Sequence, residues 1–347
     1  MNTGEKVINW LYTEQLKVDA QWSFRATSDG FTWWAAKNAQ RIEVIGAEEN
    51  EDGDKAYLVS VRTEFLYNLA INKKTLTGIN ALLMPHVSMS GPVYDQERQT
   101  LSICSLVKVH EGIREWMCPL ISMAAILQIA EARIMGPEVA KLFSAQPAES
   151  KHPKTGWRIE PDELAEIVAT LVAPVGKQPC KWTTREFQQA VDQYMQCPPS
   201  LCATSGGSGL TVEFPFGNAS SLCQLQGDQP HPRYGNGLFI LQSFPVDDLT
   251  DEEGAKLALE LNSVELGQNP SGYGFGSYCY RDGTIHFNSF LPNVVYRAGL
   301  LPNLYFTCAA RAREMSLRLA GSDWGTQPAA RRQPASALSR FMKRFGR

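Results

Sequence analysis

Residues 271–278, SGYGFGSY, combine glycines and aromatic rings in an order that could contact RNA. The RNA-contacting strand of an RNA-recognition motif reads K/R-G-F/Y-G/A-F-V-x-F/Y, and its exposed rings stack on bases. Tyr273 and Phe275 would be the exposed strand aromatics in this chain. LFILQS, at residues 238–243, resembles the second strand motif of such a domain. RNA binding through the second half of the chain is therefore one functional alternative.

The charges around this stretch oppose RNA binding. Residues 236–290 contain two basic and eight acidic side chains. Ser271 stands where the motif has a phosphate-binding Lys or Arg, and RDG at residues 281–283 starts another strand where the motif needs a helix. Phosphate attraction supplies most non-specific affinity for nucleic acid. RNA is therefore the weaker alternative. We expect 271–278 to be the first strand of a hairpin, equivalent to HVSMSGPVY at 86–94.

No motif in the sequence indicates catalysis or metal binding. Gly272, Gly274 and Gly276 form G-x-G-x-G, but a phosphate-binding loop would have to open a helix. Strand glycines mark a bulge or a close backbone approach instead. The eight cysteines include no CxxC, and none of the five histidines is spaced near them like a zinc ligand. We expect no enzyme activity and no cofactor. We also expect four buried free thiols, at Cys104, Cys118, Cys279 and Cys308.

The C-terminal residues 327–347 are basic and carry apolar side chains at helical spacing. This stretch has six basic residues and no acidic one. Its apolar residues recur at i, i+3, i+4 and i+7, which predicts an amphipathic helix beginning near Ser336. Such a helix could contact an anionic membrane or an acidic partner, whereas the alternative is a frayed terminus. The candidate contacts are Leu338, Arg340, Phe341, Met342, Lys343, Arg344 and Phe345.

Overall composition is that of a globular protein with substantial cores. Of the 347 residues 44% are hydrophobic and 20% charged, and the formal net charge is −3. The opening MNTGEKVINWLY lacks the basic and apolar regions of a signal peptide, and no uninterrupted apolar stretch approaches about 18 residues. We therefore expect a cytoplasmic protein.

Two parts of the chain repeat the same order of patterns. INALLMPHVSMSGPVYDQERQTLSICSLVKV starts at Ile79, and LNSVELGQNPSGYGFGSYCYRDGTIHFNSFLPN starts at Leu261. Each runs from a helix end with Asn through a strand, a polar turn and an alternating strand. A long helix then ends at Met135 or Met315, an offset of 180 residues. Three or four strand patterns and a helix precede each copy, which indicates a duplication.

Strands joined by short polar turns, with helices between them, predict an α+β fold. We expect two tandem repeats, each an antiparallel sheet with helices on one face in the order α-β-β-β-α-β-β-α. The first repeat covers residues 1–143. A linker with a short amphipathic helix covers 144–175, the second repeat covers 176–321, and a basic, flexible tail covers 322–347.

This element order, and the two helix-to-hairpin segments, resemble the type III secretion chaperone-like fold of the Tir-type chaperones and the YbjN family. The resemblance covers residues 2–135 and 183–315. It implies a bacterial, cytoplasmic, non-enzymatic protein that holds an extended segment of a client protein. Two copies in one chain would correspond to a covalent form of the chaperone dimer. We therefore expect a chaperone or adaptor, with RNA binding through the second repeat as the alternative.

Overall fold

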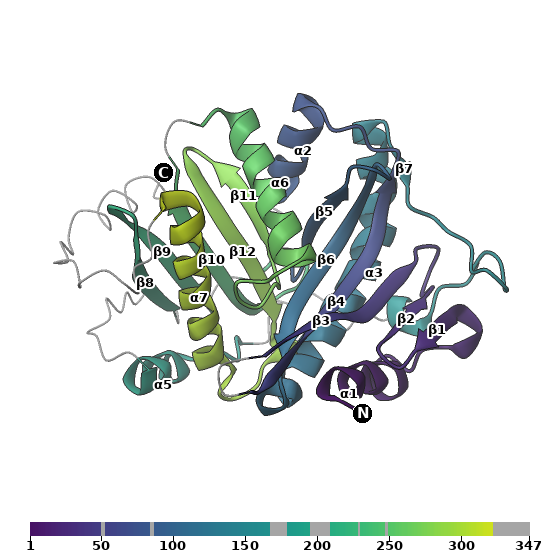
Figure 1. Cartoon of the computed structure of the whole chain (residues 1–347), viewed down its shortest axis with the longest axis horizontal. Coiled ribbons are helices and arrows are strands. Elements are labelled where there is room, and N and C mark those ends of the chain that lie inside the picture. The colour runs from purple at the N-terminus through teal and green to yellow at the C-terminus, as the bar shows by residue number, and fades with distance from the viewer. Residues whose placement is uncertain are drawn as a thin grey trace.

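The structure of the chain is a computed structural model that describes residues 1–49, 53–83, 87–166, 179–194, 209–227, 230–246 and 249–321. In this part the chain forms two antiparallel sheets covered by helices (Figure 1). The predicted α+β class and the two sheet-and-helix units are confirmed. The candidate tail contacts, from Leu338 to Phe345, lie outside the described residues.

The first half builds a seven-stranded sheet in the order β1-β2-β3-β4-β6-β5, with β7 beside β4. Four strands precede its second helix, which is the larger of the two numbers expected from the strand patterns and one more than in the simplified order α-β-β-β-α-β-β-α. Its elements are α1 (Thr3–Trp10), β1 (Ser23–Thr27), β2 (Gly30–Trp33), β3 (Gln40–Glu49), β4 (Lys55–Tyr67), α2 (Lys73–Leu83), β5 (Gly91–Asp95), β6 (Thr100–Val109), α3 (Arg114–Phe143) and β7 (Gln146–Pro147).

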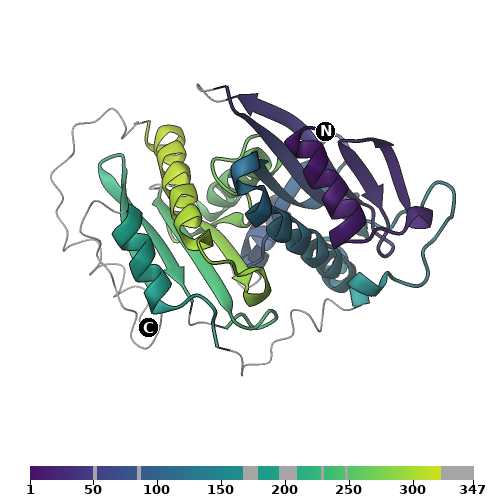
Figure 2. The ribbon, with the colours of Figure 1, turned by 90° about the horizontal axis from the view of Figure 1, so that it is seen from below.

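The second half builds a five-stranded sheet in the order β11-β12-β10-β9-β8 and follows the predicted element order. Its elements are α5 (Thr184–Tyr194), β8 (Gly209–Phe216), β9 (Ala219–Gln226), β10 (Gly237–Pro245), α6 (Asp251–Gly267), β11 (Ser277–Arg281), β12 (Thr284–Pro292) and α7 (Leu300–Ala320). Figure 2 shows α1 with α3 along the first sheet, and α5 with α7 along the second.

Local sequence explains where α6 begins and how its hairpin turns. Thr250 and Glu253 form a capping box: the Thr250 Oγ1 accepts from the Glu253 N–H at 3.3 Å, and the Glu253 Oε2 accepts from the Thr250 N–H at 2.9 Å. The β11–β12 turn is Asp282-Gly283, with φ of 48° and 73°. Positive φ at both central residues is the geometry that a two-residue hairpin prefers.

The first sheet is covered on both faces where β5 and β6 lie. On one face, Gln128 of α3 donates to the Val61 carbonyl at 3.2 Å and to the Ser105 Oγ at 3.0 Å. On the other face, Leu266 of α6 packs on Val93 and Cys104. Cys104 and Ser105 are neighbours on β6 and therefore point to opposite faces of the sheet. Helix α6 of the second half thus packs on the face opposite to the one that α3 covers.

Helix α3 has the length and composition of a membrane span. The most apolar 18-residue window of the segment Glu111–Phe143 is 83% buried inside the protein. Most of its residues from Met117 to Ala132 belong to the buried set. In this fold α3 therefore packs as a core helix of the first half.

The two halves share one core and meet at a glycine. A single cluster of buried apolar side chains contains residues of both halves. Between them, the Gly274 N–H donates to the Leu106 carbonyl at 3.0 Å, and the Leu106 N–H donates back at 3.4 Å. A Cβ on Gly274 would lie 2.3 Å from the Leu106 oxygen. Only glycine permits this approach, which joins the second half to β6.

Two asparagines, at matching positions of the duplicated helices, close the outer edge of β11. Asn262 of α6 donates to the Tyr278 carbonyl at 2.9 Å and accepts from its N–H at 2.7 Å. Asn80 of α2 does the same with Tyr280, at 2.8 and 2.7 Å. An edge strand exposes backbone N–H and carbonyl groups that have no partner strand. In β11, one helix from each half provides the asparagine that hydrogen-bonds to these groups.

Candidate binding site

The stretch 271–278 is not an exposed aromatic strand, so the prediction for Tyr273 and Phe275 was wrong. Strand β11 begins only at Ser277, and the residues before it form an irregular approach to the strand. Phe275 is 3% exposed and belongs to the core, and Tyr273 is half-buried. The RNA alternative therefore loses the two rings on which it depended.

A buried ion pair holds this stretch in place. Arg311 of α7 and Glu265 of α6 are 1% and 2% exposed, and the Arg311 Nη2 lies 2.9 Å from the Glu265 Oε1. The same guanidinium nitrogen donates to the Tyr273 carbonyl at 2.8 Å. The other Glu265 oxygen accepts from the Ser271 N–H at 2.9 Å and from its Oγ at 2.6 Å. The stretch is therefore structural.

The protein contains two copies of a five-residue turn that the duplication does not explain. HPKTG at residues 152–156 and HPRYG at 231–235 both read H-P-(K/R)-x-G, 79 positions apart. We call them the first and the second HP turn. The first follows β7 and the second joins β9 to β10. The repeat at an offset of 180 residues did not reveal them, although both are visible in the sequence.

Backbone hydrogen bonds close each HP turn in the same way. His152 and Gly156 exchange two of them, at 2.9 and 3.0 Å. His231 and Gly235 exchange two as well, at 2.7 and 3.0 Å. The glycines have φ of 85° and 66°, a region that few other residues enter. The spacing of His and Gly is therefore required by the turn itself.

The histidine ring fixes each turn from inside. The His152 Nδ1 accepts from the Thr155 N–H at 3.0 Å, and the His231 Nδ1 accepts from the Arg233 and Tyr234 N–H groups at 3.0 and 3.2 Å. Both rings are buried. An accepting Nδ1 places the ring proton on Nε2. Each histidine therefore has a structural role within its turn. The Lys or Arg two residues later is the side chain that can contact other groups.

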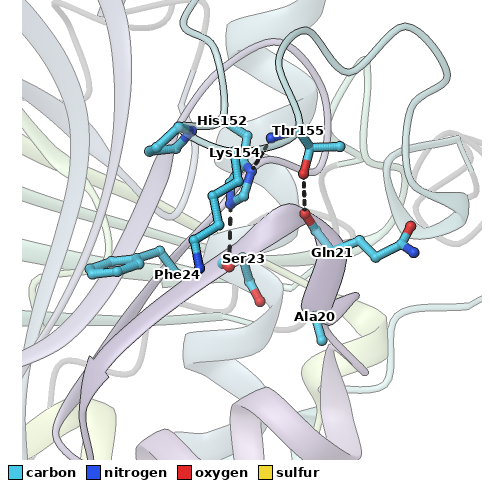
Figure 3. Close-up of a pocket in the computed structure, with 8 residues that line it drawn as sticks. Ala20, Gln21, Ser23, Phe24, His152, Lys154 and Thr155 are labelled. Carbon is cyan, nitrogen blue, oxygen red and sulfur yellow. Dashed lines mark hydrogen bonds between the residues drawn. The ribbon is translucent and has the colours of Figure 1, made fainter.

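The first HP turn forms an open depression against the outer side of β1. Its volume is about 710 Å³. Figure 3 shows the Lys154 side chain running toward Phe24 and Ser23, with His152 behind it. The lining residues are Ala20, Gln21, Ser23, Phe24, His152, Pro153, Lys154 and Thr155.

This surface combines exposed apolar rings with cations. Phe24 is 53% exposed and Trp157 is 43% exposed. Lys151 lies over the Trp157 ring, with its Nζ 5.5 Å from the ring centre. Lys154 is exposed, and no carboxylate in the described part of the chain comes within 4.0 Å of its Nζ. The depression therefore offers an apolar contact beside an unpaired positive charge.

The edge of β1 is itself closed to strand pairing. The Thr155 Oγ1 donates to the Gln21 carbonyl at 2.8 Å, and the His152 Nε2 lies 3.4 Å from the Ser23 carbonyl. The register with β2 then shifts after Phe24. Bulges and covered carbonyls prevent a further strand from adding to a sheet edge. A partner would therefore contact the side chains of the depression.

The four cysteine thiols that were predicted to be free and buried are free and buried in the structure. Cys104, Cys118, Cys279 and Cys308 carry no disulfide, and all four are buried. Burial raises the pKa of the Cys104 thiol to about 12 and that of Cys118 to about 11. A thiol is a nucleophile only when deprotonated, so these two are inert near neutral pH. Over the described ranges, no three His, Cys, Asp or Glu side chains gather where a metal ion could bind.

Comparison with known proteins identifies no relative of this chain. No protein-family model matches it, and neither does any curated protein or solved structure. The resemblance to type III secretion chaperones therefore stays a prediction. The geometry of the depression beside β1 is the basis for a functional proposal.

Proposed function

We propose that this protein is a non-enzymatic protein-binding module, a chaperone or adaptor that holds a segment of a partner protein. The observation that carries the proposal is the depression beside β1, where the exposed Phe24 ring shares one open surface with Lys154, which has no ion-pair partner among the described residues. Aromatic side chains are enriched at protein interfaces and often supply most of the binding energy. The other lining side chains include polar groups that can satisfy a partner's backbone.

The fold supports this role in two ways. The shared core of the two halves supports the base of the depression, because β1 pairs with β2, whose Phe31 and Trp33 belong to that core. The second half also has the element order of the chaperone class that the sequence resembles. A binding module of that class needs a stable platform and a surface for a client, and this chain offers both.

Site-specific photo-crosslinking tests the proposal. A benzophenone amino acid placed at Phe24 should crosslink a defined partner in cells of the native host. Phe306 on α7 is the matched control position, since it is 50% exposed against 53% for Phe24 and lies in the other half of the chain. We expect Phe24→Ser to lower recovery of that partner by about tenfold or more, and Phe306→Ser to leave it unchanged.

The proposal fails if position 24 gives no specific crosslink, or if both serine variants retain the partner equally. Circular dichroism of the two variants shows whether the fold is kept. Both substitutions replace exposed rings, so we expect native spectra.

A further inference from the structure

The second HP turn contacts a helix of the same chain, α3. The Tyr234 Oη donates to the Glu131 Oε1 at 2.6 Å. The Arg233 Nη1 lies 3.0 Å from the Met135 Sδ. Glu131 and Met135 are at positions i and i+4 of α3, so they share one side of the helix. This HP turn therefore binds a helix through one carboxylate and one apolar side chain.

At the first HP turn the Thr155 Oγ1 donates to the Gln21 carbonyl of the short 3₁₀-helix Ala20–Trp22 at 2.8 Å, so Lys154 is the side chain of this turn that is left to contact a partner. Lys154 takes the place of Arg233 in the pattern, and Thr155 takes the place of Tyr234. Lys154 is exposed and, in the part of the chain that the structure describes, has no carboxylate within 4.0 Å. The exposed Phe24 ring lines the same depression and supplies the apolar contact.

The charge of this surface selects the kind of occupant. Lys151 and Lys154 make no ion pair within the described ranges, although the whole chain has a net charge of −3. Complementary charge raises association rates and suppresses wrong partners. The chain's own residues 327–347 carry six positive charges and no negative one, so these cations repel them. An acidic segment of another protein is favoured.

We propose that the first HP turn binds a helical segment of a partner protein that carries an acidic residue and a large apolar residue one turn apart. The carboxylate pairs with the Lys154 Nζ through a charge-assisted hydrogen bond, and the apolar side chain packs on Phe24. The inference rests on the proposed function, because it concerns the same depression. It adds the charge and the helical form of the bound segment.

The test uses the full chain and a phage library of helical peptides that is randomised along one helix face. Selection on the wild-type protein is compared with selection on Phe24→Ser, Lys154→Glu and Lys74→Glu. Lys74 is an exposed lysine of α2 and serves as the matched control for charge reversal. Peptides enriched by the wild type and lost with Phe24→Ser should carry Asp or Glu three or four positions from an apolar residue.

Charge reversal gives the second readout. We expect Lys154→Glu to bind the selected acidic peptides about tenfold more weakly and to enrich Lys or Arg peptides instead, whereas Lys74→Glu behaves as the wild type. Two outcomes would overturn the inference and leave the proposed function standing. In the first, the peptides that depend on Phe24 carry no acidic residue. In the second, selection on the Lys154→Glu variant enriches the same peptides as selection on the wild type. Absence of any Phe24-dependent peptide would also overturn the inference, whereas absence of a specific crosslink at position 24 would overturn the proposed function.

Discussion

At the scale of single residues, the Arg311–Glu265 pair shows why the aromatic stretch looked like a nucleic-acid surface and is not one. The glycines at 272, 274 and 276 are visible in the sequence, and a close backbone approach was one of the expectations for them. Which groups they approach depends on Glu265 and Arg311, which lie on two different helices. No local pattern reports such a pairing, so the sequence could not place Phe275 in the core.

Removal of Arg311 should be strongly destabilising. Arg311→Met leaves the Glu265 carboxylate buried without its cation, and the free energy of unfolding should fall by about 3 to 5 kcal/mol. Urea denaturation followed by tryptophan fluorescence measures it. The matched control is Arg318→Met on the same helix, where the pair with Glu314 is partly exposed and should contribute below about 1 kcal/mol. Equal losses in the two variants would contradict this assignment.

His286 should make the protein less stable in mild acid. Burial lowers its pKa to about 4, whereas an exposed histidine titrates near 6.5. Between these two values the unfolded chain binds a proton that the folded chain does not, so the free energy of unfolding falls as pH falls from about 6.5 to about 4. The full effect is about 3 kcal/mol. His286→Gln should remove that part of the pH dependence in urea titrations at pH 7, 5.5 and 4.5. An unchanged profile would contradict the prediction.

At the scale of elements, β5 and β11 show how the two copies have diverged. Asp95 pairs with Thr100 and Arg281 pairs with Thr284, so Pro92 of β5 occupies the place of Tyr278 in β11. Proline has no N–H and could not donate to an asparagine as Tyr278 does. Asn80 instead reaches across to the second half.

Asn80→Ala should loosen β11 locally. The substitution leaves the N–H and the carbonyl of Tyr280 without partners and should cost about 2 kcal/mol of stability. Hydrogen exchange monitored by NMR should show faster exchange at the Tyr280 amide, while the Tyr278 amide, which Asn262 holds, keeps its protection. Loss of protection at both amides together would show that the two asparagines do not act separately.

The sequence predicts a helix or strand well when the pattern that defines it lies within a few residues, and poorly when distant contacts decide the conformation. The helix-to-hairpin segments were predicted correctly because periodicity and the polar turns at 95–98 and 281–283 lie within a few residues. The start of β11 was placed too early, because the strand-like alternation of residues 271–276 is overridden by contacts with β6 and α7. The HP turns were missed because the two copies lie at non-equivalent places in the two halves.

At the scale of the whole molecule, the two halves should unfold together. The junction at Gly274 joins the sheets, and the apolar core is continuous across it. Gly274→Ala would force a Cβ within 2.3 Å of the Leu106 oxygen and should lower stability by about 2 kcal/mol or more. The matched control is Gly46→Ala in β3, where the nearest atom to a new Cβ is 3.4 Å away. Calorimetry should give one transition for the wild type. Two separate wild-type transitions would contradict a shared core.

The unequal use of the two HP turns has a consequence for stoichiometry. A symmetric dimer of identical subunits must repeat every surface, so a client-binding surface on it occurs twice. Here both HP turns belong to one chain, and one closes on α3 while the other stays open beside Phe24. We therefore expect each chain to hold one helical segment of its partner, in a complex of one to one.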